Sequence, residues 1–420
     1  MDETVKNVIP EIVQQHAEET AFLWLQRENA ICAPHYDLKD LTKHDERVEA
    51  HIDGLRIAGE PGWEICREQL GQEEPGEVFA ASVMAFESGR KEWIDAVLEV
   101  GSKSYVLFRG VVSALGWLPF EQASALIEKL LSDESPVLKR IGLAASSIHR
   151  QDPDEILKTA LTHENLTLRA RALKAVGELG RTDLLNDVRV HCHSEDVLCR
   201  LAAAWSSARL GDTSSISVLK ELVLSGEHMA ERAGAMALRR MAIKEAHAWQ
   251  RELTNQPESH RLAVQAVGVI GDPVSMSWLI EQMAIPDVAR VAGESFSMIT
   301  GVDLAYDDLD GEWPEEFDAG PTEDPEDENV EMDADEDLSW PNPELLQKWW
   351  SNNKLSYQNG TRYLCGKPMT IDSLNEVLKT GYQRQRMAAA IELAIRQPDT
   401  PLFETRAPGF RQQQLLRGRI

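Results

Sequence analysis

The sequence predicts an all-α fold, an α-solenoid of helical pairs with a helical N-terminal cap and a small C-terminal module. One helix-turn-helix unit recurs about every thirty residues between Ser135 and Gly301. The second helix of each unit combines an early arginine with a run of small residues, and few windows show the period-two alternation of half-buried strands. Because no such unit can bury its apolar face alone, a fixed period of this size predicts stacked repeats.

Six second helices are expected from this repeat. They span residues 137–145, 168–175, 198–204, 230–236, 260–266 and 289–293. Three of these helices reach a Leu-Gly or Ile-Gly pair that ends at Gly180, Gly211 or Gly271, and Gly301 follows one repeat later. Glycine is expected there because it adopts the left-handed conformation that closes a helix.

The 420 residues are too many for one compact core, which favours several segments. We expect a helical N-terminal cap over 1–100 and a repeat array over 101–302. An acidic, disordered linker over 303–340 and a small basic C-terminal module over 341–420 would complete the chain. Within the cap, one helix is predicted over 10–29 and a second over 37–57.

The formal charge of −27 predicts repulsion from nucleic acid and from anionic membranes. Residues 303–337 contain eighteen acids and no Lys or Arg, whereas residues 341–420 contain twelve Lys or Arg and six acids. The acidity is therefore concentrated in one insertion, which self-repulsion should keep disordered.

The expected compartment is cytoplasmic. The chain begins without the basic and apolar stretches of a signal peptide, and no run approaches the length of a membrane span. The five cysteines include no Cys-x-x-Cys pair, as expected for reduced thiols in a reducing compartment.

The candidate binding residues are six arginines near the N-terminal ends of the second helices, which we call the arginine ladder. They are Arg140, Arg169, Arg200, Arg232, Arg261 and Arg290. An acid precedes each arginine by three to six residues, and these acids are Glu134, Glu164, Glu195, Glu227, Glu258 and Asp287. One hypothesis is that the arginines form structural ion pairs with these acids. The alternative is a basic groove for an acidic partner or a phosphate backbone.

Two clusters contain residue types that can bind metals. His44 and His51 share a helix face, but Glu46 and Asp53 point away from them. His191, Cys192 and His193 are adjacent and therefore diverge, and no second pair completes a tetrahedral zinc site. The sequence therefore predicts no metal site, although a metal-dependent enzyme centred on His44 and His51 is a further hypothesis.

No sequence pattern points to catalysis or to a cofactor. The chain contains no Gly-x-x-x-x-Gly-Lys loop, no Gly-x-Ser-x-Gly elbow and no recognisable Cys/His order. We therefore expect a protein that is not an enzyme and that has no cofactor.

Seven further segments carry a family resemblance, at residues 8–13, 15–19, 45–56, 62–64, 360–364, 383–386 and 401–408. They resemble a proteobacterial family of HEAT-like repeat proteins with no established activity. The resemblance extends over nearly the whole chain, but none of these segments is chemically specific. It implies a HEAT-like fold, and for some members an association with type VI secretion gene neighbourhoods.

These observations together favour a protein-binding scaffold or adaptor. Its concave solenoid surface would hold a protein partner, and neither a membrane nor nucleic acid is the expected partner. The alternative hypothesis is a HEAT-type nucleic-acid-binding protein or base-excision enzyme.

Overall fold

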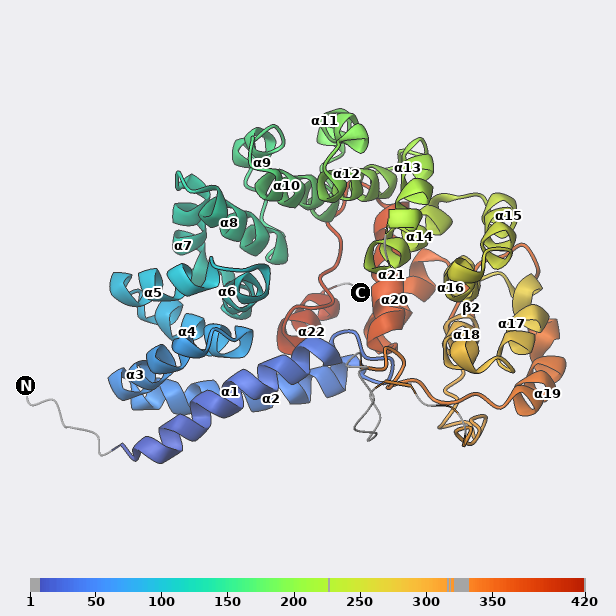
Figure 1. Cartoon of the computed structure of the whole chain (residues 1–420), viewed down its shortest axis with the longest axis horizontal. Coiled ribbons are helices and arrows are strands. Elements are labelled where there is room, and N and C mark those ends of the chain that lie inside the picture. Colours follow the sequence, from blue (N-terminus) through green and yellow to red (C-terminus); the bar gives the residue numbers. More distant parts are fainter. Residues whose placement is uncertain (1–7, 226, 316, 318, 321–331, 419–420) are drawn as a thin grey trace, which may run out of the picture. The chain divides into compact units, whose positions relative to one another are not determined.

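The computed structural model describes residues 8–225, 227–315, 317, 319–320 and 332–418 (Figure 1). Over these residues the fold is all-α, as the sequence predicts, and the only sheet is the antiparallel pair of β1 with β2. The chain divides into two compact units. Unit 1 comprises Met1–Leu210 with Gln397–Ile420, and unit 2 comprises Gly211–Arg396.

Unit 1 contains the N-terminal helices and the C-terminal helix. They are α1 (Pro10–Ala30), α2 (Leu38–Ala58), α3 (Glu60–Gln69), α4 (Pro75–Ser88), α5 (Lys91–Gly101), α6 (Tyr105–Trp117), α7 (Phe120–Ser132), α8 (Pro136–Ile148), α9 (Glu155–Ala160), α10 (Leu166–Leu179), α11 (Leu185–Arg189), α12 (Val197–Arg209) and α22 (Gly409–Arg417).

Unit 2 contains the later repeats and most of the predicted C-terminal module. Its elements are α13 (Ser215–Leu222), α14 (Glu227–Arg240), α15 (Ile243–Thr254), α16 (His260–Ile270), α17 (Met276–Gln282), α18 (Pro286–Thr300), α19 (Pro343–Asn353), β1 (Tyr363–Leu364), β2 (Lys367–Pro368), α20 (Ile371–Thr380) and α21 (Gln383–Arg396).

The six predicted second helices are confirmed as α8, α10, α12, α14, α16 and α18. The predicted left-handed glycines are also confirmed at the ends of three of them. Gly180, Gly271 and Gly301 have φ angles of 75°, 72° and 76°, and each directly follows its helix. Gly211 follows Leu210 at the end of α12 with a φ of 115°.

Small residues allow neighbouring second helices to approach closely. A Cβ atom added to Gly177 in α10 would lie 2.4 Å from the Ser206 Oγ of α12, and that hydroxyl donates to the Leu173 carbonyl at 2.8 Å. The same arrangement recurs in unit 2, where the Ser295 hydroxyl of α18 donates to the Val264 carbonyl of α16 at 3.1 Å. Larger residues would force these helices apart.

The N-terminal cap is built on the two helices that the sequence predicts. Pro10 occupies the first turn of α1, and the Asp37 side chain caps α2 by accepting from the Asp40 amide at 2.8 Å. Between these helices, the Arg27 Nε donates to the Asp45 carboxylate at 2.5 Å, and both side chains are buried.

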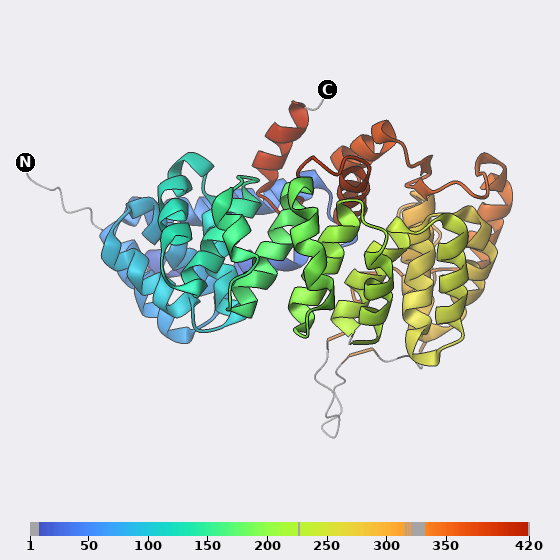
Figure 2. The same cartoon turned by 90° about the horizontal axis from the view of Figure 1, so that it is seen from above.

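In unit 1, residues 397–412 run across the C-terminal ends of the repeat helices, and we call them the unit 1 strap (Figure 2). The buried Arg209 side chain at the end of α12 donates to the carbonyl oxygens of Pro398 and Thr400. The Leu402 amide then donates to the Glu178 carbonyl of α10 at 2.8 Å. The strap is therefore bonded to the repeats in two ways: the Arg209 side chain donates to the strap backbone, and the Glu178 carbonyl, which the helix end leaves unpaired, accepts from it.

The strap continues from the repeats to the N-terminal cap. Arg150, at the end of α8, donates through Nε to the Leu402 carbonyl at 2.5 Å and pairs with Glu404 at 3.0 Å. The Gly409 amide then donates to the Asp45 carboxylate at 2.6 Å. The last residues of the chain thus contact one of the first helices and all the intervening second helices of unit 1.

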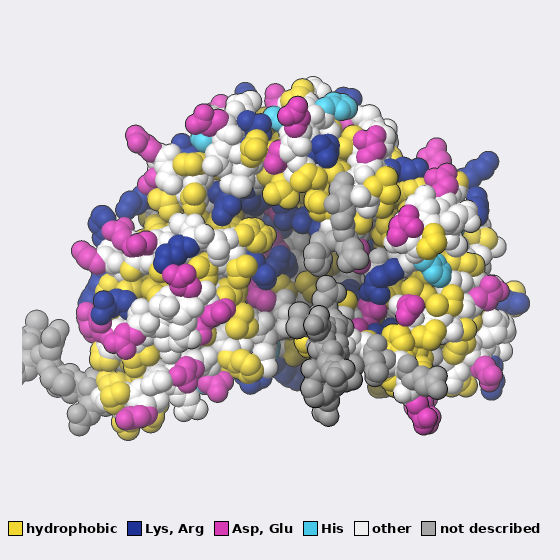
Figure 3. Space-filling view, viewed as in Figure 1, with side chains coloured by type: hydrophobic (Ala, Val, Ile, Leu, Met, Phe, Trp, Pro, Cys, Tyr) yellow, Lys and Arg dark blue, Asp and Glu magenta, His cyan; other side chains and the backbone are white. Residues whose placement is uncertain are grey.

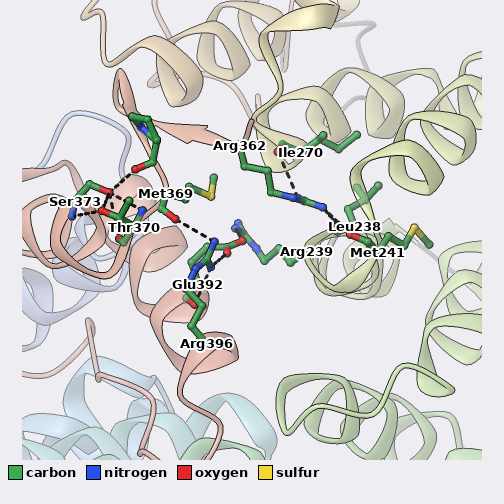
Figure 4. A network of polar contacts seen from close by, with 11 residues as sticks. Leu238, Arg239, Met241, Ile270, Arg362, Met369, Thr370, Ser373, Glu392 and Arg396 are labelled. Atoms are coloured by element: carbon green, nitrogen blue, oxygen red, sulfur yellow. Dashed lines mark hydrogen bonds and ion pairs between the residues drawn. The ribbon is translucent and has the colours of Figure 1, made fainter. Parts of the chain in front are cut away.

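In unit 2, residues 360–366 cross the helix ends in the same way, and we call them the unit 2 strap. The Arg362 guanidinium donates to the carbonyl oxygens of Leu238 and Met241 at the end of α14, and to that of Ile270 at the end of α16 (Figure 4). The Cys365 amide donates to the Met298 carbonyl of α18 at 2.9 Å.

A buried ion cluster secures α21 to the array in unit 2. The Glu392 carboxylate pairs with Arg239 of α14 at 3.0 Å and with Arg396 of its own helix (Figure 4). Burial would raise the pKa of Glu392, but the two cations lower it below its ordinary value. By contacts, residues 341–396 belong to unit 2 with the later repeats, and the described residues from 397 to 418 belong to unit 1 with the earlier ones. The single module over 341–420 stays a prediction.

Candidate binding surface

The arginine ladder lies within the first two turns of the second helices. Arg140, Arg169 and Arg200 belong to α8, α10 and α12 of unit 1, and Arg232, Arg261 and Arg290 belong to α14, α16 and α18 of unit 2. The straps contact the opposite, C-terminal ends of these helices. The straps therefore leave the ladder edge of each unit uncovered.

For five of the six arginines, the predicted pairing with the acid just before it is not what the structure shows. Glu134, Glu164, Glu195, Glu258 and Asp287 are all exposed, and none of them forms an ion pair with its arginine among the described residues. The side chain of Glu227 lies outside the described residues. These five acids occupy exposed positions just before or in the first turn of the helices, where the helix dipole stabilises them without a direct partner.

In unit 2, two ladder arginines instead bind carboxylates from the end of the acidic insertion. Arg261 donates to both oxygens of Asp335 at 2.7 and 2.5 Å, and Arg290 donates to both oxygens of Asp333 at 2.5 and 2.9 Å. The hydrogen bonds from Arg290 lower the pKa of Asp333 below its ordinary value. Such two-pronged pairs are the strongest arrangement of arginine with a carboxylate.

Aromatic rings of the insertion surround the Arg290 guanidinium. Its central carbon lies 4.7 Å from the Trp313 ring centre and 5.9 Å from the centres of Phe317 and Trp340. The Arg290 side chain is only 4% exposed, so these cation–π contacts act in a largely desolvated setting.

Apolar side chains hold the two ends of the insertion against the last repeat. Leu304, Leu309 and Leu338 are buried in one core with α18 and α19, and the Gly311 amide donates to the Trp340 carbonyl at 2.8 Å. Although the sequence predicts disorder over 303–340, residues 303–315 and 332–340 therefore have defined contacts. These stretches are held because their leucines are buried and because Arg261 and Arg290 neutralise two of their acids. Residues 321–331 lie outside the described residues.

In unit 1, the ladder arginines have no carboxylate partner among the described residues. Arg169 and Arg200 each donate to the carbonyl six residues earlier, those of His163 and Ser194, at 2.8 and 2.7 Å. Arg140 lies 4.1 Å above the Phe108 ring, and its buried Nε atom has no hydrogen-bond acceptor. Burial lowers the pKa of Arg140, and the nearby Tyr105 side chain offsets that effect only in part.

Exposed apolar side chains lie on the same edge of unit 1. Tyr105, at the start of α6, is 70% exposed; Leu166 and Leu198, at the starts of α10 and α12, are 43% and 51% exposed. The Cys199 thiol donates to the Leu166 carbonyl at 3.4 Å, which shows that the last two helix starts are adjacent. Figure 3 shows hydrophobic, basic and acidic side chains interspersed over the repeats.

The candidate metal ligands are engaged in other contacts. The buried His44 ring bonds through Nε2 to the Leu23 carbonyl at 2.8 Å, and His51 bonds through Nδ1 to His16 at 3.2 Å. Cys192 is buried beside the Ser207 hydroxyl at 3.8 Å. Within the described ranges, no group of three or more His, Cys, Asp or Glu side chains is placed to hold a metal ion.

Sequence reasoning identified the ladder but missed its partners in unit 2. Asp333 and Asp335 lie within a run of eighteen acids, in which no single residue stands out. The available signal was Leu338 and Trp340 directly after them, since an apolar pair at the end of an acidic run can anchor that end to a core. The strap arginines Arg209 and Arg362 were missed because their acceptors are backbone carbonyls far away in sequence.

Comparison with known families agrees with the stacked helical pairs. Residues 153–239, which extend from just before α9 almost to the end of α14, match the family model of HEAT repeats. HEAT repeats generally act as protein-interaction scaffolds. No curated protein matches the sequence. No helix among the described residues is long and apolar enough to cross a membrane.

Proposed function

We propose that this protein is a non-enzymatic scaffold or adaptor that binds a protein partner on the concave solenoid surface, and that the ladder edge of unit 1 forms part of this contact. The observation that carries the proposal is the contrast along the arginine ladder. Arg261 and Arg290 hold carboxylates of the same chain, whereas Arg140, Arg169 and Arg200 present cations without such partners on an edge that also exposes apolar side chains. Mixed arginine and apolar surfaces are typical of protein interfaces.

A protein partner fits the charge of this molecule better than nucleic acid does. The net charge of −27 opposes a phosphate backbone, and two of the six ladder arginines are already neutralised by Asp333 and Asp335. We propose that the interaction takes place in the cytoplasm. Because the family resemblance implies a link to type VI secretion, we propose that system as its context.

Affinity capture from the source organism tests the proposal. Tagged full-length protein is incubated with nuclease-treated lysate, alongside two matched variants. Ala202→Glu places a charge at a half-buried position on α12, a second helix, and Ala96→Glu makes the same change at a half-buried position on α5 in the N-terminal cap. We expect the same protein to be captured by the wild type and by Ala96→Glu, and to be lost with Ala202→Glu when circular dichroism shows both variants folded.

Two results would contradict the proposed function. One is the absence of any protein that the wild type captures reproducibly and Ala202→Glu does not. The other is retention of purified protein on a DNA column that weakens with rising salt, because only the nucleic-acid-binding alternative requires it.

A further inference from the structure

In unit 2, the ladder edge binds an acidic segment of the same chain. Asp333 and Asp335, two residues apart in one segment, bind arginines on two neighbouring second helices, α18 and α16. Leu338 enters the adjacent core, and Trp340 packs beside Arg290. The bound segment therefore combines alternate acids with a leucine and a tryptophan a few residues later.

Unit 1 has a similar row of arginines, but no acidic segment binds them among the described residues. Arg169 and Arg200 lie one repeat apart, as Arg261 and Arg290 do, and each uses one nitrogen for a local carbonyl. A guanidinium has five N–H donors, so most of them remain for a carboxylate. Arg140 adds a buried nitrogen that has no acceptor.

The apolar half of the arrangement is also present in unit 1. Tyr105, Leu166 and Leu198 are large side chains exposed at helix starts on the ladder edge. Neighbouring carboxylate-binding and apolar groups fit a segment of mixed acidic and apolar character better than a purely acidic one, because exposed ion pairs alone contribute little binding energy.

We propose that the ladder edge of unit 1, formed by Arg140, Arg169, Arg200, Tyr105, Leu166 and Leu198, is a docking site for an acidic segment of the partner protein that contains leucine or tryptophan. The inference rests on the proposed function and names the class of partner that this surface recognises. The acidic insertion of the chain occupies the corresponding edge of unit 2 and serves as the model for the docked segment.

A synthetic peptide with the sequence of residues 332–342, labelled with fluorescein, is the probe. Its binding to the full-length protein is measured by fluorescence anisotropy. We expect saturable binding that Arg169→Ala combined with Arg200→Ala weakens at least about tenfold, as loss of two charge-assisted contacts should. Arg67→Ala is the matched control, because Arg67 is an exposed arginine of unit 1 paired with Glu64 on α3 and should leave the affinity within about twofold.

A second variant separates binding from folding. Arg169 and Arg200 also donate hydrogen bonds to the turns before their helices, so replacing them removes a structural contact as well. Leu166→Ser combined with Leu198→Ser leaves these hydrogen bonds intact and should also weaken binding. A peptide in which Asp333 and Asp335 are replaced by asparagine should bind at least about tenfold more weakly. Arg261→Ala combined with Arg290→Ala should leave the affinity within about twofold.

Several results would overturn the inference. The first is that the peptide shows no saturable binding, and the second is that both unit 1 variants leave its affinity unchanged. The third is that binding is lost only when Arg261 and Arg290 are replaced, which would place the peptide on unit 2. Self-association of the full chain that disappears with the Arg169 and Arg200 substitutions would also overturn it, because the occupant would then be a second copy. A captured partner that ignores these substitutions overturns this inference alone, whereas peptide binding without any captured partner overturns only the proposed function.

Discussion

Gly180 at the end of α10 lies directly against the backbone of Thr400, so that a Cβ atom at Gly180 would be 2.7 Å from the Thr400 carbonyl oxygen. The two residues are far apart in sequence, yet both belong to unit 1. Gly271 meets Tyr363 in the same way in unit 2, with a Cβ-to-oxygen distance of 2.5 Å. The helix-ending glycines thus do two things: they close their helices and they leave room for a strap.

Replacing Gly180 by alanine tests the strap contact. Both Gly180 and Gly89 have left-handed backbones, but a Cβ atom at Gly89 would meet nothing within 4 Å. Gly89→Ala should therefore cost only the backbone strain, on the order of 1 kcal/mol, whereas Gly180→Ala should cost more because Thr400 must also move. Thermal unfolding followed by circular dichroism measures both, and equal shifts would mean that the contact with Thr400 is easily relieved.

Replacing Arg209 by methionine should loosen the unit 1 strap. Arg209 is fully buried and donates to the carbonyl oxygens of Pro398 and Thr400, so its loss leaves two acceptors unpaired at roughly 1 to 3 kcal/mol each. We expect faster proteolytic cleavage within residues 397–412, identified by mass spectrometry. Arg67→Met, at a half-exposed arginine, is the control and should leave the cleavage rate unchanged. Equal rates for the wild type and Arg209→Met would contradict a restraining role.

Replacing Arg290 by lysine should release the end of the acidic insertion. Lysine keeps the charge but cannot form the two-pronged pair with Asp333 or stack as a plane on Trp313. We expect the tryptophan emission to shift to longer wavelength as Trp313 and Trp340 become more hydrated. Arg384→Lys, which alters the ion pair of an arginine with Glu294 away from the insertion, should leave the emission unchanged. An unchanged spectrum in both variants would show that the aromatic contacts do not depend on the guanidinium.

The stability of the protein should fall between about pH 6.5 and pH 4 because of His149. Burial lowers its pKa from an ordinary 6.5 to about 4, although its Nε2 bonds to the Leu115 carbonyl at 2.9 Å. In this window the unfolded chain binds a proton that the folded state does not, so unfolding is favoured as pH falls, by up to about 3 kcal/mol. Urea unfolding from pH 7.5 to 5 measures the loss, and His149→Gln should flatten it.

A slope that is identical in wild type and His149→Gln would assign the acid sensitivity to another group. Glu178 adds to the loss only at lower pH. Burial would raise the pKa of Glu178, but Arg171, Lys174 and Arg150 lower it to about 2 from an ordinary 4.5. Its stabilising contribution is therefore complete above about pH 4.5 and is lost as pH falls toward 2.

Ala203→Leu tests the close packing of the second helices. Ala203 is fully buried in α12, so the added methylenes should overpack the interface at a cost of about 1 to 3 kcal/mol. Ala235 in α14 is only half-buried, so Ala235→Leu should cost less. Chemical denaturation of both variants gives the two free energies, and a fully stable Ala203→Leu variant would contradict the packing.

The sequence alone determined the class of fold, because that information is local and repeated. The spacing of small residues predicts helices that approach closely, and Gly177 and Gly268 indeed lie against Ser206 and Ser295. The left-handed ends at Gly180, Gly271 and Gly301 follow from the chemistry of glycine. The placement of Arg140, Arg169 and Arg200 near helix starts is likewise a matter of local register.

The partners of the ladder, in contrast, depend on the tertiary structure. Nothing in the local sequence distinguishes Arg261, which holds Asp335, from Arg200, which bonds to the Ser194 carbonyl. The difference arises because the acidic insertion starts where the last repeat ends, and Leu309 and Leu338 bury it there. The straps are a second case. Arg362 donates to backbone carbonyls at a helix end and Arg209 donates to backbone carbonyls of the unit 1 strap, and neither contact leaves a side-chain pattern in the sequence. Contacts between a charged side chain and a distant backbone are set by chain path, and only the folded chain brings those groups together.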